Sequence, residues 1–350
     1  MTGKLFSVGI VGTGRMAATM ALTMRHSLSL RATAVSSTTA ARAKEFATLY
    51  GLHAHPDAAS LCADPKVDLV YIANANNLHA SHAIMALEAG KAVLCEKPFA
   101  LTLAEGAAVA EAARVARRFF MEAFWTQLAP VSRELGQLAA EGQLGELRHL
   151  ETSFGYPLHG QDVKRLTEPA QGGVLFDRAG YGLAQAIALL GAPEQLFAQS
   201  GRLGQSVQLS LRHRGGTTAQ IAVAADSLLA NSTTLSGSNG AAGFGPPAPA
   251  AELLWIRRFD PQPITAPRAS RDPKALARSL PFMRRLRNLV PAGNRRWLPW
   301  GASAYLPMLD HVGHCLASGQ VESPIVPING SIAVLTALDS ARTQLEEAQQ

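Results

Sequence analysis

The sequence predicts an α/β protein in which an N-terminal doubly wound parallel sheet is followed by a C-terminal α+β domain built on a mostly antiparallel sheet. The chain has 350 residues, which at about 150 residues per domain indicates two domains. Over residues 1–124, apolar strand-like runs alternate with helical patterns, as βαβ units require. Over residues 125–350, strand-like runs follow one another closely, which favours antiparallel or mixed pairing.

The first region is expected to form five strands joined by helices. The strands are expected at Phe6–Val11, Leu30–Ser36, Val67–Ala73, Ala92–Cys95 and Phe119–Glu122. The helices are expected at Met16–His26, Ala40–Tyr50, Leu78–Ala89 and Leu103–Arg117. Gly90 marks the end of the third helix, because glycine readily adopts the left-handed conformation that ends helices.

The second region is expected to contain more strands than helices. Strands are expected at Glu146–Phe154, Val207–His213, Thr217–Ala225 and Ser232–Ser236, with Arg214-Gly215-Gly216 as a hairpin turn. Helices are expected at Val174–Leu190 and at Ser331–Ala348, the second as a C-terminal cover. The segment Gly237–Pro249 is rich in glycine, proline and alanine and is expected to be a loop.

The composition is that of an ordinary globular protein, with 47% hydrophobic and 17% charged residues. No apolar run reaches the roughly 18 residues that span a bilayer, and the N-terminus does not resemble a secretory leader. Cys62, Cys95 and Cys315 form no CxxC pair, which disfavours disulfides and zinc and indicates the reducing cytoplasm. No His, Asp or Cys cluster has metal-ligand spacing, so no metal is expected.

The first strand leads into the turn Gly12-Thr13-Gly14-Arg15-Met16-Ala17, a GxGxxA pattern that opens a helix. Gly12 permits the tight turn, Gly14 lets the backbone approach a pyrophosphate, and Ala17 lets helix and strand pack closely. The helix N-terminus offers unpaired N–H groups to the phosphates. Residues 1–124 are therefore predicted to be a Rossmann domain that binds NAD(P), with Gly12, Thr13, Gly14, Arg15 and Met16 at the cofactor.

The end of the second strand discriminates between NAD and NADP. An acidic residue there would bind the ribose 2′-hydroxyl of NAD, but the chain has Ser36-Ser37-Thr38, followed by Arg42. Hydroxyl groups can donate to a 2′-phosphate, and a guanidinium can pair with it. We therefore expect NADP in preference to NAD, with Arg42 as an ordinary solvent-exposed helix residue as the alternative.

At three places the sequence resembles the Gfo/Idh/MocA oxidoreductases. Cys95-Glu96-Lys97-Pro98, about 80 residues after the glycine turn, resembles the EKP motif of that family. Tyr71-Ile72-Ala73 and Asn77-Leu78-His79 resemble the loop after its fourth strand. Gly172-Gly173-Val174-Leu175-Phe176-Asp177, with Tyr181 four residues later, resembles its GGGxLxDxGxY helix.

The resemblance extends over residues 5–240 and 303–345. Phe120-Met121-Glu122-Ala123-Phe124-Trp125 and Glu322-Ser323-Pro324-Ile325-Val326-Pro327 are most similar to the dimeric dihydrodiol dehydrogenase and D-xylose dehydrogenase branch. Two departures border the expected active site. Arg178-Ala179 replace the usual apolar-Gly pair, and Asn74 and Asn76 replace the usual Thr and Pro or His. These changes concern the substrate more than the cofactor.

The resemblance implies that Lys97, Tyr181 and Asp177 are catalytic. Lys97 ends a predicted parallel strand, where ligands bind, and a lysine near the nicotinamide can stabilise the oxyanion that develops as hydride moves. Tyr181 can exchange a proton with the substrate oxygen, and a nearby ammonium is expected to lower its pKa from about 10. Asp177 lies one helical turn before Tyr181 and could orient the substrate or the lysine. The peptide before Pro98 is typically cis in the family.

The remaining site residues implied by the resemblance fall into two groups. Cofactor contacts are expected from Asn74, Asn77, His79, Glu96 and Lys97, and substrate contacts from Trp125, Phe154, Asp177 and Tyr181. The implied function is NADP-dependent hydride transfer between nicotinamide and a carbon of a sugar, polyol or dihydrodiol. The alternatives are an NAD-dependent glycosidase that uses transient oxidation and a non-catalytic NAD(P)-sensing regulator. The expected partners are a small carbohydrate or diol substrate and further copies of the chain, in a homodimer or homotetramer formed through the C-terminal sheet.

The net charge of +6 is concentrated in one segment. Between Arg257 and Arg296, ten arginines and one lysine stand against two carboxylates, so the rest of the chain is net acidic. Residues 267–300 form a basic, proline-containing insertion for which a short amphipathic helix is expected. Its cationic residues are Arg284, Arg285, Arg287, Arg295 and Arg296, and its apolar ones are Phe282, Met283, Leu286, Leu289 and Trp297. A lid near the substrate is favoured over contact with a membrane or nucleic acid, neither of which is an expected partner.

Overall fold

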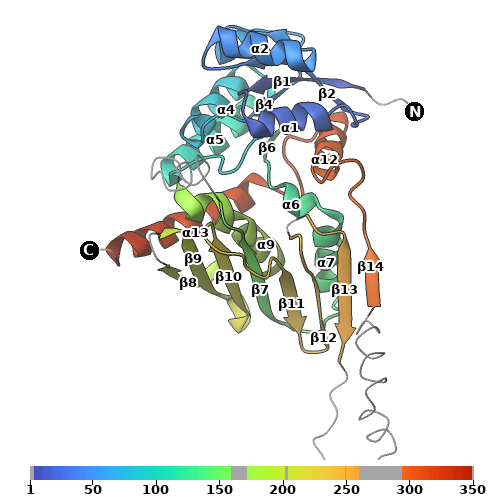
Figure 1. The fold of residues 1–350 in the computed structure, drawn as a ribbon, viewed down its shortest axis with the longest axis vertical. Helices are drawn as coiled ribbons and strands as arrows, with labels where there is room; N and C mark the ends of the chain where they lie inside the picture. The colour runs from blue at the N-terminus through green and yellow to red at the C-terminus, as the bar shows by residue number, and fades with distance from the viewer. Residues whose placement is uncertain (1–3, 159–171, 202–203, 249, 260–293, 349–350) are drawn as a thin grey trace, which may run out of the picture.

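The computed structural model describes residues 4–158, 172–201, 204–248, 250–259 and 294–348. They form two sheets, one of six strands in the upper half of Figure 1 and one of eight strands in the lower half. The predicted combination of a parallel sheet with a mostly antiparallel one is therefore confirmed. Among the helices of these ranges, none is both long enough and apolar enough to cross a membrane.

The first sheet is parallel throughout and has the order β3-β2-β1-β4-β5-β6. Its strands are β1 Phe6–Val11, β2 Leu30–Ser36, β3 His53–Ala54, β4 Leu69–Ile72, β5 Ala92–Cys95 and β6 Phe120–Glu122. The helices are α1 Arg15–Thr23, α2 Ala40–Tyr50, α3 Ala58–Ala63, α4 His79–Glu88 and α5 Leu103–Ala116. The strand order reverses between β1 and β4, and ligands bind at such a switch point, beyond the carboxyl ends of the strands.

Local signals explain where these helices begin and end. The Thr39 side chain accepts a hydrogen bond from the backbone N–H of Arg42 at the start of α2, and Gly51 ends this helix with a φ of 72°. Thr102 and Glu105 form a reciprocal capping box at the start of α5. The short elements β3 and α3 were not expected, because runs of two and six residues carry too little periodicity to stand out.

The second sheet has the order β14-β13-β12-β11-β7-β10-β9-β8. Its strands are β7 Leu147–Gly155, β8 Pro193–Ser200, β9 Ser206–His213, β10 Thr218–Ala224, β11 Thr233–Gly237, β12 Gly240–Phe244, β13 Leu253–Arg258 and β14 Asn294–Trp297. Within this second sheet, β7 and β10 are the one parallel pair among the described strands, and the other pairs are antiparallel. The expected hairpin turn at Arg214–Gly216 joins β9 to β10.

Helices cover one face of this sheet (Figure 1). They are α7 Pro130–Ala140, α9 Gly180–Leu190 and α13 Ile328–Glu347. The short helix α6 Trp125–Leu128 packs against α7 and α9, and α12 Leu306–Ala317 packs against α6 and against β2 of the first sheet. The expected helix Val174–Leu190 is interrupted, because Leu175–Ala179 form a π-helical turn, η3, before α9 begins. Such wide turns inside helices are frequent at functional sites.

Two expectations for the second region are wrong. The segment expected as a loop, Gly237–Pro249, contains strand β12, because its glycines allow close pairing: a Cβ on Gly240 would lie 2.4 Å from the Arg257 carbonyl oxygen. Arg295, Arg296 and Trp297 lie in β14, paired antiparallel with β13, and not in an amphipathic helix. The rest of the expected helix lies outside the described residues.

The C-terminal part of the chain connects the two sheets. Helix α13 packs against α9 and β8 of the lower half and against α5 and β6 of the upper half. Just before it, the backbone N–H of Phe120 in β6 donates to the Val321 carbonyl at 3.1 Å, and Phe120 forms a parallel bridge with Glu322. The outer edge of the first sheet is therefore completed by residues about two hundred positions later in the chain.

Candidate active site

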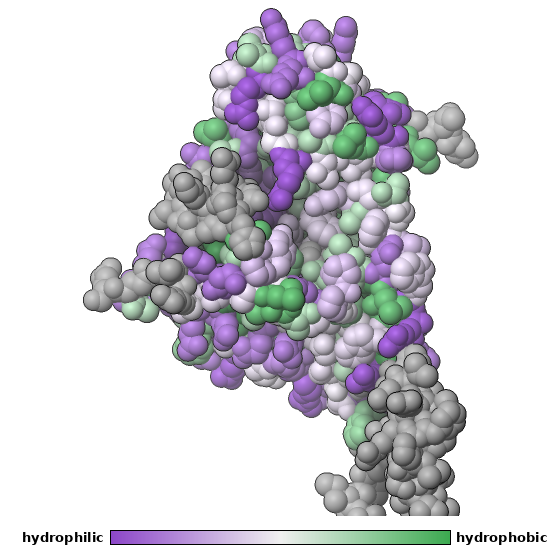
Figure 2. Space-filling model, viewed as in Figure 1, coloured by the Kyte–Doolittle hydropathy of each residue, from purple (hydrophilic) through white to green (hydrophobic). Residues whose placement is uncertain are grey.

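A cleft of about 750 Å³ lies beyond the carboxyl ends of β1, β4 and β5, between the two sheets. The surface is hollowed between the upper and lower parts of the molecule (Figure 2). Many of the expected site residues line the cleft, namely Gly14, Arg15, Met16, Asn74, His79, Glu96, Lys97, Trp125, Phe154, Asp177 and Tyr181. The fold therefore assembles residues that are up to 167 positions apart in the sequence.

The glycine turn has the geometry that its motif requires. Gly12 has a φ of +121°, and a Cβ on it would lie 2.4 Å from the carbonyl oxygen of Ala73, so no other residue fits there. Gly14 caps the N-terminus of α1 in an extended conformation. The hydroxyl groups of Thr13 and Ser37 are 2.9 Å apart, which joins the turn to the segment that follows β2.

Two buried polar atoms, one at the end of β2 and one in the cleft, have no hydrogen-bond partner among the described residues. They are the Ser36 Oγ, which neither donates nor accepts a hydrogen bond within the described ranges, and the Asn74 Oδ1, which accepts none. Buried polar atoms are rarely left unpaired in native proteins, so they point to a polar ligand. Thr38 and Arg42 are exposed near the same strand end. The orphaned atoms and the glycine turn fit a dinucleotide that lies across the switch point.

Asn77 is one of seven expected cofactor residues that lie outside the cleft lining. It is exposed on the short 3-10 helix Asn76–Leu78 and does not line the cleft, whereas its neighbour Asn76 does. The other six are Gly12, Thr13, Ser36, Ser37, Thr38 and Arg42, which belong to the glycine turn or to the segment that follows β2.

Lys97 follows β5 and precedes a cis peptide bond to Pro98, as the resemblance implied. Its Nζ donates to the Asp177 carbonyl oxygen at 2.6 Å and to the Asp177 Oδ1 at 2.9 Å. Burial opposes the charge of this ammonium, but the attraction of the Asp177 carboxylate outweighs it and raises the pKa of Lys97 above its ordinary value. Lys97 is therefore charged at neutral pH, and the described residues accept hydrogen bonds from two of its three N–H groups.

The hydroxyl-bearing ring of Tyr181 lies beside this ammonium, with the Lys97 Nζ 4.8 Å from the ring centroid. The expectation that the ammonium lowers the pKa of Tyr181 below its usual value is wrong in its net result. Burial raises this pKa, and Lys97 offsets only part of that effect while Glu96 and Asp177 add to it. Tyr181 therefore holds its proton at neutral pH.

Two buried side chains, Tyr71 and His79, form hydrogen bonds to the residues on either side of Lys97. The Tyr71 hydroxyl donates to the Glu96 Oε1 at 2.6 Å, and burial raises the pKa of Glu96 although this hydrogen bond and Lys97 lower it. The His79 Nδ1 donates to the Pro98 carbonyl oxygen at 2.7 Å. Burial lowers the pKa of His79 to about 4, so its ring is neutral at pH 7 and acts as a fixed hydrogen-bond donor.

Aromatic rings form the rest of the wall around Tyr181. The ring centroids of Phe154 and Trp125 lie 6.0 Å and 6.4 Å from that of Tyr181, both in edge-on arrangements. Tyr305 lies 4.9 Å from Trp125 and also lines the cleft. Sequence reasoning missed Tyr305, since no motif surrounds it and only the return of the chain before α12 brings it to the cleft.

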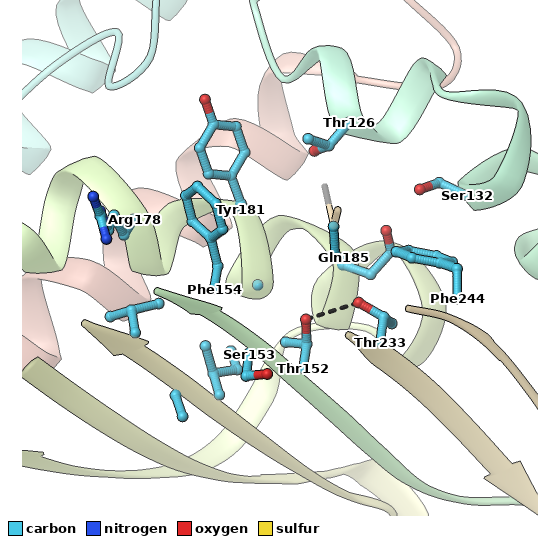
Figure 3. A pocket seen from close by; sticks show the side chains of 15 residues that line it. Thr126, Ser132, Thr152, Ser153, Phe154, Arg178, Tyr181, Gln185, Thr233 and Phe244 are labelled. Carbon is cyan, nitrogen blue, oxygen red and sulfur yellow. Dashed lines mark hydrogen bonds between the residues drawn. The ribbon is translucent and has the colours of Figure 1, made fainter. Parts of the chain in front are cut away.

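A second, small cavity of about 30 Å³ lies behind Tyr181, between α9 and the second sheet. In Figure 3 the Tyr181 hydroxyl points away from the sheet, whereas Gln185 points between the helices and the strands. The hydroxyl groups of Thr152 and Thr233 are 2.8 Å apart at the base of the cavity. Phe154, Arg178 and Tyr181 line both this cavity and the large cleft.

No group of three or more His, Cys, Asp or Glu side chains that could hold a metal ion occurs in the described part of the chain.

Two family profiles match most of the chain. Residues 6–124 match the profile described as an oxidoreductase family with an NAD-binding Rossmann fold, and residues 132–242 match the GFO/IDH/MocA C-terminal domain. Among curated relatives, the trans-1,2-dihydrobenzene-1,2-diol dehydrogenase of Bos taurus is 30% identical over 317 residues, covering 88% of this chain and 87% of the relative. The enzyme of the same name from Mus musculus is 29% identical and covers 95% of each chain.

Solved structures share the fold at lower identity. The aldose-aldose oxidoreductase of Caulobacter crescentus, complexed with glycerol, superposes with a TM-score of 0.79 at 23% identity and covers 99% of this chain and 98% of its own. A levoglucosan dehydrogenase complexed with NADH and levoglucosan gives 0.81 at 18% identity, with 98% of each chain covered. With both domain profiles matched and a relative at 30% identity along most of its length, this chain is an oxidoreductase of the Gfo/Idh/MocA family.

Proposed function

We propose that the protein is an NADP-dependent oxidoreductase that transfers hydride between nicotinamide and a carbinol carbon of a sugar, polyol or dihydrodiol. The observation that carries this proposal is the convergence of Lys97, Asp177 and Tyr181 in one cleft at the carboxyl ends of the first sheet. The names of the relatives, which are diol and sugar oxidoreductases, support the substrate class.

The charges of these three residues suit stabilisation of an alkoxide. A bound nicotinamide supplies or accepts the hydride. The remaining N–H group of Lys97 can donate to the substrate oxygen, and the ammonium can offset the negative charge that develops on it. Asp177 positions the lysine through two hydrogen bonds. Tyr181 keeps its proton at neutral pH and can therefore give it to this oxygen when a carbonyl is reduced.

The buried side chains of His79 and Tyr71 have a positioning role in this proposal. His79 holds the Pro98 carbonyl, and Tyr71 holds the Glu96 carboxyl, so the backbone at Lys97 has little freedom. The aromatic side chains of Trp125 and Phe154 exclude water around Tyr181 and would contact the substrate.

NADP is proposed as the preferred cofactor because the end of β2 offers hydroxyl groups and a guanidinium where NAD enzymes carry a carboxylate. Ser37 and Thr38 lie at this end, and Arg42 is exposed in the first turn of α2. A phosphate contact of this kind contributes about 1.5–3 kcal/mol, so NADPH is expected to bind at least about tenfold more tightly than NADH. A fluorescence titration in which NADH binds equally well would reject the preference.

The experiment that tests the reaction is a panel of aldoses, polyols and diols with NADP and NAD, followed by absorbance at the nicotinamide band. Net reduction of NADP with at least one of these alcohols supports the proposal. Cofactor that stays bound through purification without net turnover would favour the glycosidase alternative, and absence of turnover with every compound would favour a regulator.

The same proposal includes the organisation of the chain. We divide it into a cofactor domain, residues 1–124, and a substrate and oligomerisation domain, residues 125–350.

The face of the second sheet opposite α9 and α13 is exposed, as shown by Phe197 at 65% exposure, and we expect it to join copies of the chain into a homodimer or homotetramer. Light scattering tests the assembly. Three free, buried cysteines agree with the reducing cytoplasm.

A further inference from the structure

One cation in the cleft has no place in the chemistry described so far. Arg178 stands between Asp177 and Tyr181 in the π-helical turn. Its exposed fraction is 1%, which makes it the largest of the fully buried side chains. It lines both the large cleft and the small cavity behind Tyr181. A buried arginine requires a physical reason, because the burial of a charge is costly unless the charge is paired.

The guanidinium is held by one of its two terminal nitrogens. The Arg178 Nη1 donates to the carbonyl oxygens of Tyr156 and Ala224, just beyond β7 and at the end of β10. The guanidinium carbon lies 4.3 Å from the centre of the Tyr156 ring and 5.3 Å from that of Phe154. Figure 3 shows Phe154 between Arg178 and Tyr181. These contacts fix the orientation of the side chain on the cleft wall.

Three of the five guanidinium N–H groups of Arg178 have no acceptor among the described residues. Within the described ranges, no residue accepts a hydrogen bond from the Arg178 Nε or Nη2. These two nitrogens form the side-on edge of the guanidinium, whose parallel N–H groups match the two oxygens of a carboxylate or phosphate.

The charge of Arg178 also lacks a close counterion. No carboxylate of the described residues lies within 4.0 Å of it, and the Oδ1 of the adjacent Asp177 is hydrogen-bonded to Lys97. Asp177 and the phenol of Tyr156 are the titratable groups near enough to affect it. Burial lowers the pKa of Arg178, so the site disfavours the charge that the residue must carry. An anion supplied from outside the chain would relieve this imbalance.

We propose that Arg178 is a specificity-determining residue that binds an oxyanion of the substrate, so that the preferred substrate is an acidic sugar derivative. The inference rests on the proposed hydride transfer at Lys97 and Tyr181, and it names the substrate class. A carboxylate and a phosphate share the required chemistry. Sugar acids and sugar phosphates are therefore the two arms of the test.

The experiment compares matched substrates with the intact protein and NADP: D-glucose, D-gluconate, D-glucuronate and D-glucose 6-phosphate. We expect at least a tenfold higher kcat/KM for one acidic arm than for glucose. Arg178→Leu should lower this preference at least tenfold, mainly through KM, and Arg178→Lys should restore part of it, because lysine keeps the charge but loses the fork. Arg114→Leu removes an exposed arginine of α5 and should leave the preference unchanged.

A binding readout separates this inference from the proposed reaction. Calorimetric titration of gluconate into the protein with NADPH bound reports Arg178 even if no compound turns over. Absence of turnover with tight, Arg178-dependent binding would reject only the proposed reaction. Equal kcat/KM for glucose and the acids, or equal gluconate binding by the intact protein and Arg178→Leu, would overturn the inference. If Arg178→Leu does not fold, competition by malonate but not by malonamide supports the oxyanion site, and equal effects of the two overturn it.

Discussion

Replacement of Lys97 by methionine tests the proposed chemistry most directly. The substitution keeps the length and apolar body of the side chain but removes the ammonium that lies 2.9 Å from the Asp177 Oδ1 and 4.8 Å from the Tyr181 ring centroid. If this ammonium stabilises the developing oxyanion, its loss removes one preformed donor. Such a donor contributes about 2.7–4 kcal/mol to the transition state, which corresponds to a decrease in kcat of about 10²–10³.

The substitution also affects stability. Two hydrogen bonds to Asp177 are lost, and the carboxylate keeps a side-chain exposure of 25%, so its charge is only partly deprived of water. We expect a decrease of about 1.5–3 kcal/mol in the free energy of unfolding. Affinity for NADPH should change little, because we propose that the glycine turn and the end of β2 provide most of the cofactor contacts.

Lys91→Met is the matched control. Lys91 directly precedes β5, whereas Lys97 follows it, and its Nζ donates to the carbonyl oxygens of Asp64 and Val67 at 2.6 Å and 2.8 Å. The control should lose comparable stability but keep kcat within about twofold, because a donor remote from the reacting oxygen has no share in transition-state stabilisation. Initial rates are read at the nicotinamide band and stability by urea unfolding. A Lys97→Met protein that retains kcat within tenfold of the parent would refute the assignment.

Three further predictions concern the cleft, the first turn of α2 and a buried carboxyl group of β6. Tyr181→Phe should lower kcat for carbonyl reduction by about 10²–10⁴, which is the scale of a lost general acid. The rate of the parent protein should stay level through neutral pH, because the pKa of Tyr181 is raised above 10.0. A parent rate that falls between neutral and mildly alkaline pH would contradict this. Arg42→Ala should weaken NADPH binding about tenfold in a fluorescence titration and leave NADH unchanged; equal effects on both would show that Arg42 does not contact a phosphate. Burial raises the pKa of Glu122 from 4.5 to about 8, so the folded state binds the Glu122 proton more tightly than the unfolded state does. The free energy of unfolding of the parent protein should therefore fall as pH rises through this interval, by up to about 1.4 kcal/mol per pH unit. Glu122→Gln, unfolded in urea across the same interval, should lack this decline, and parallel curves for the two proteins would count against it.

Much of the first sheet could be predicted from the sequence because both of its faces are covered. Strands β1, β4 and β5 are almost entirely buried, so they stand out as continuous apolar runs between helical patterns. The glycine turn and the EKP motif then located the cleft, because both follow strands of the same parallel sheet. What the motifs left undetermined was the set of residues that other parts of the chain bring to this cleft, such as Tyr305.

Two features of the second half of the chain, strand β12 and the pKa of Tyr181, were harder to predict. Close pairing of β12 with its neighbours depends on Gly240 and Gly243, and glycine is more often a sign of a loop than of a strand. The direction of the Tyr181 pKa shift depends on the balance between burial and the nearby ammonium. A motif identifies the ammonium but says nothing of burial, which results from the packing of Trp125 and Phe154 around the ring.

The hydrogen bond from Phe120 to Val321 has a consequence for synthesis on the ribosome. Strand β6 is complete once residue 122 has emerged, but its outer edge stays unpaired until residues 321 and 322 arrive. At about 5–20 residues per second, the edge is open for roughly 10–40 seconds. An unpaired strand edge is a template for association between chains. We therefore expect nascent chains arrested between these two positions to depend on chaperones, and completed chains to be released from them once the C-terminal segment has closed the edge.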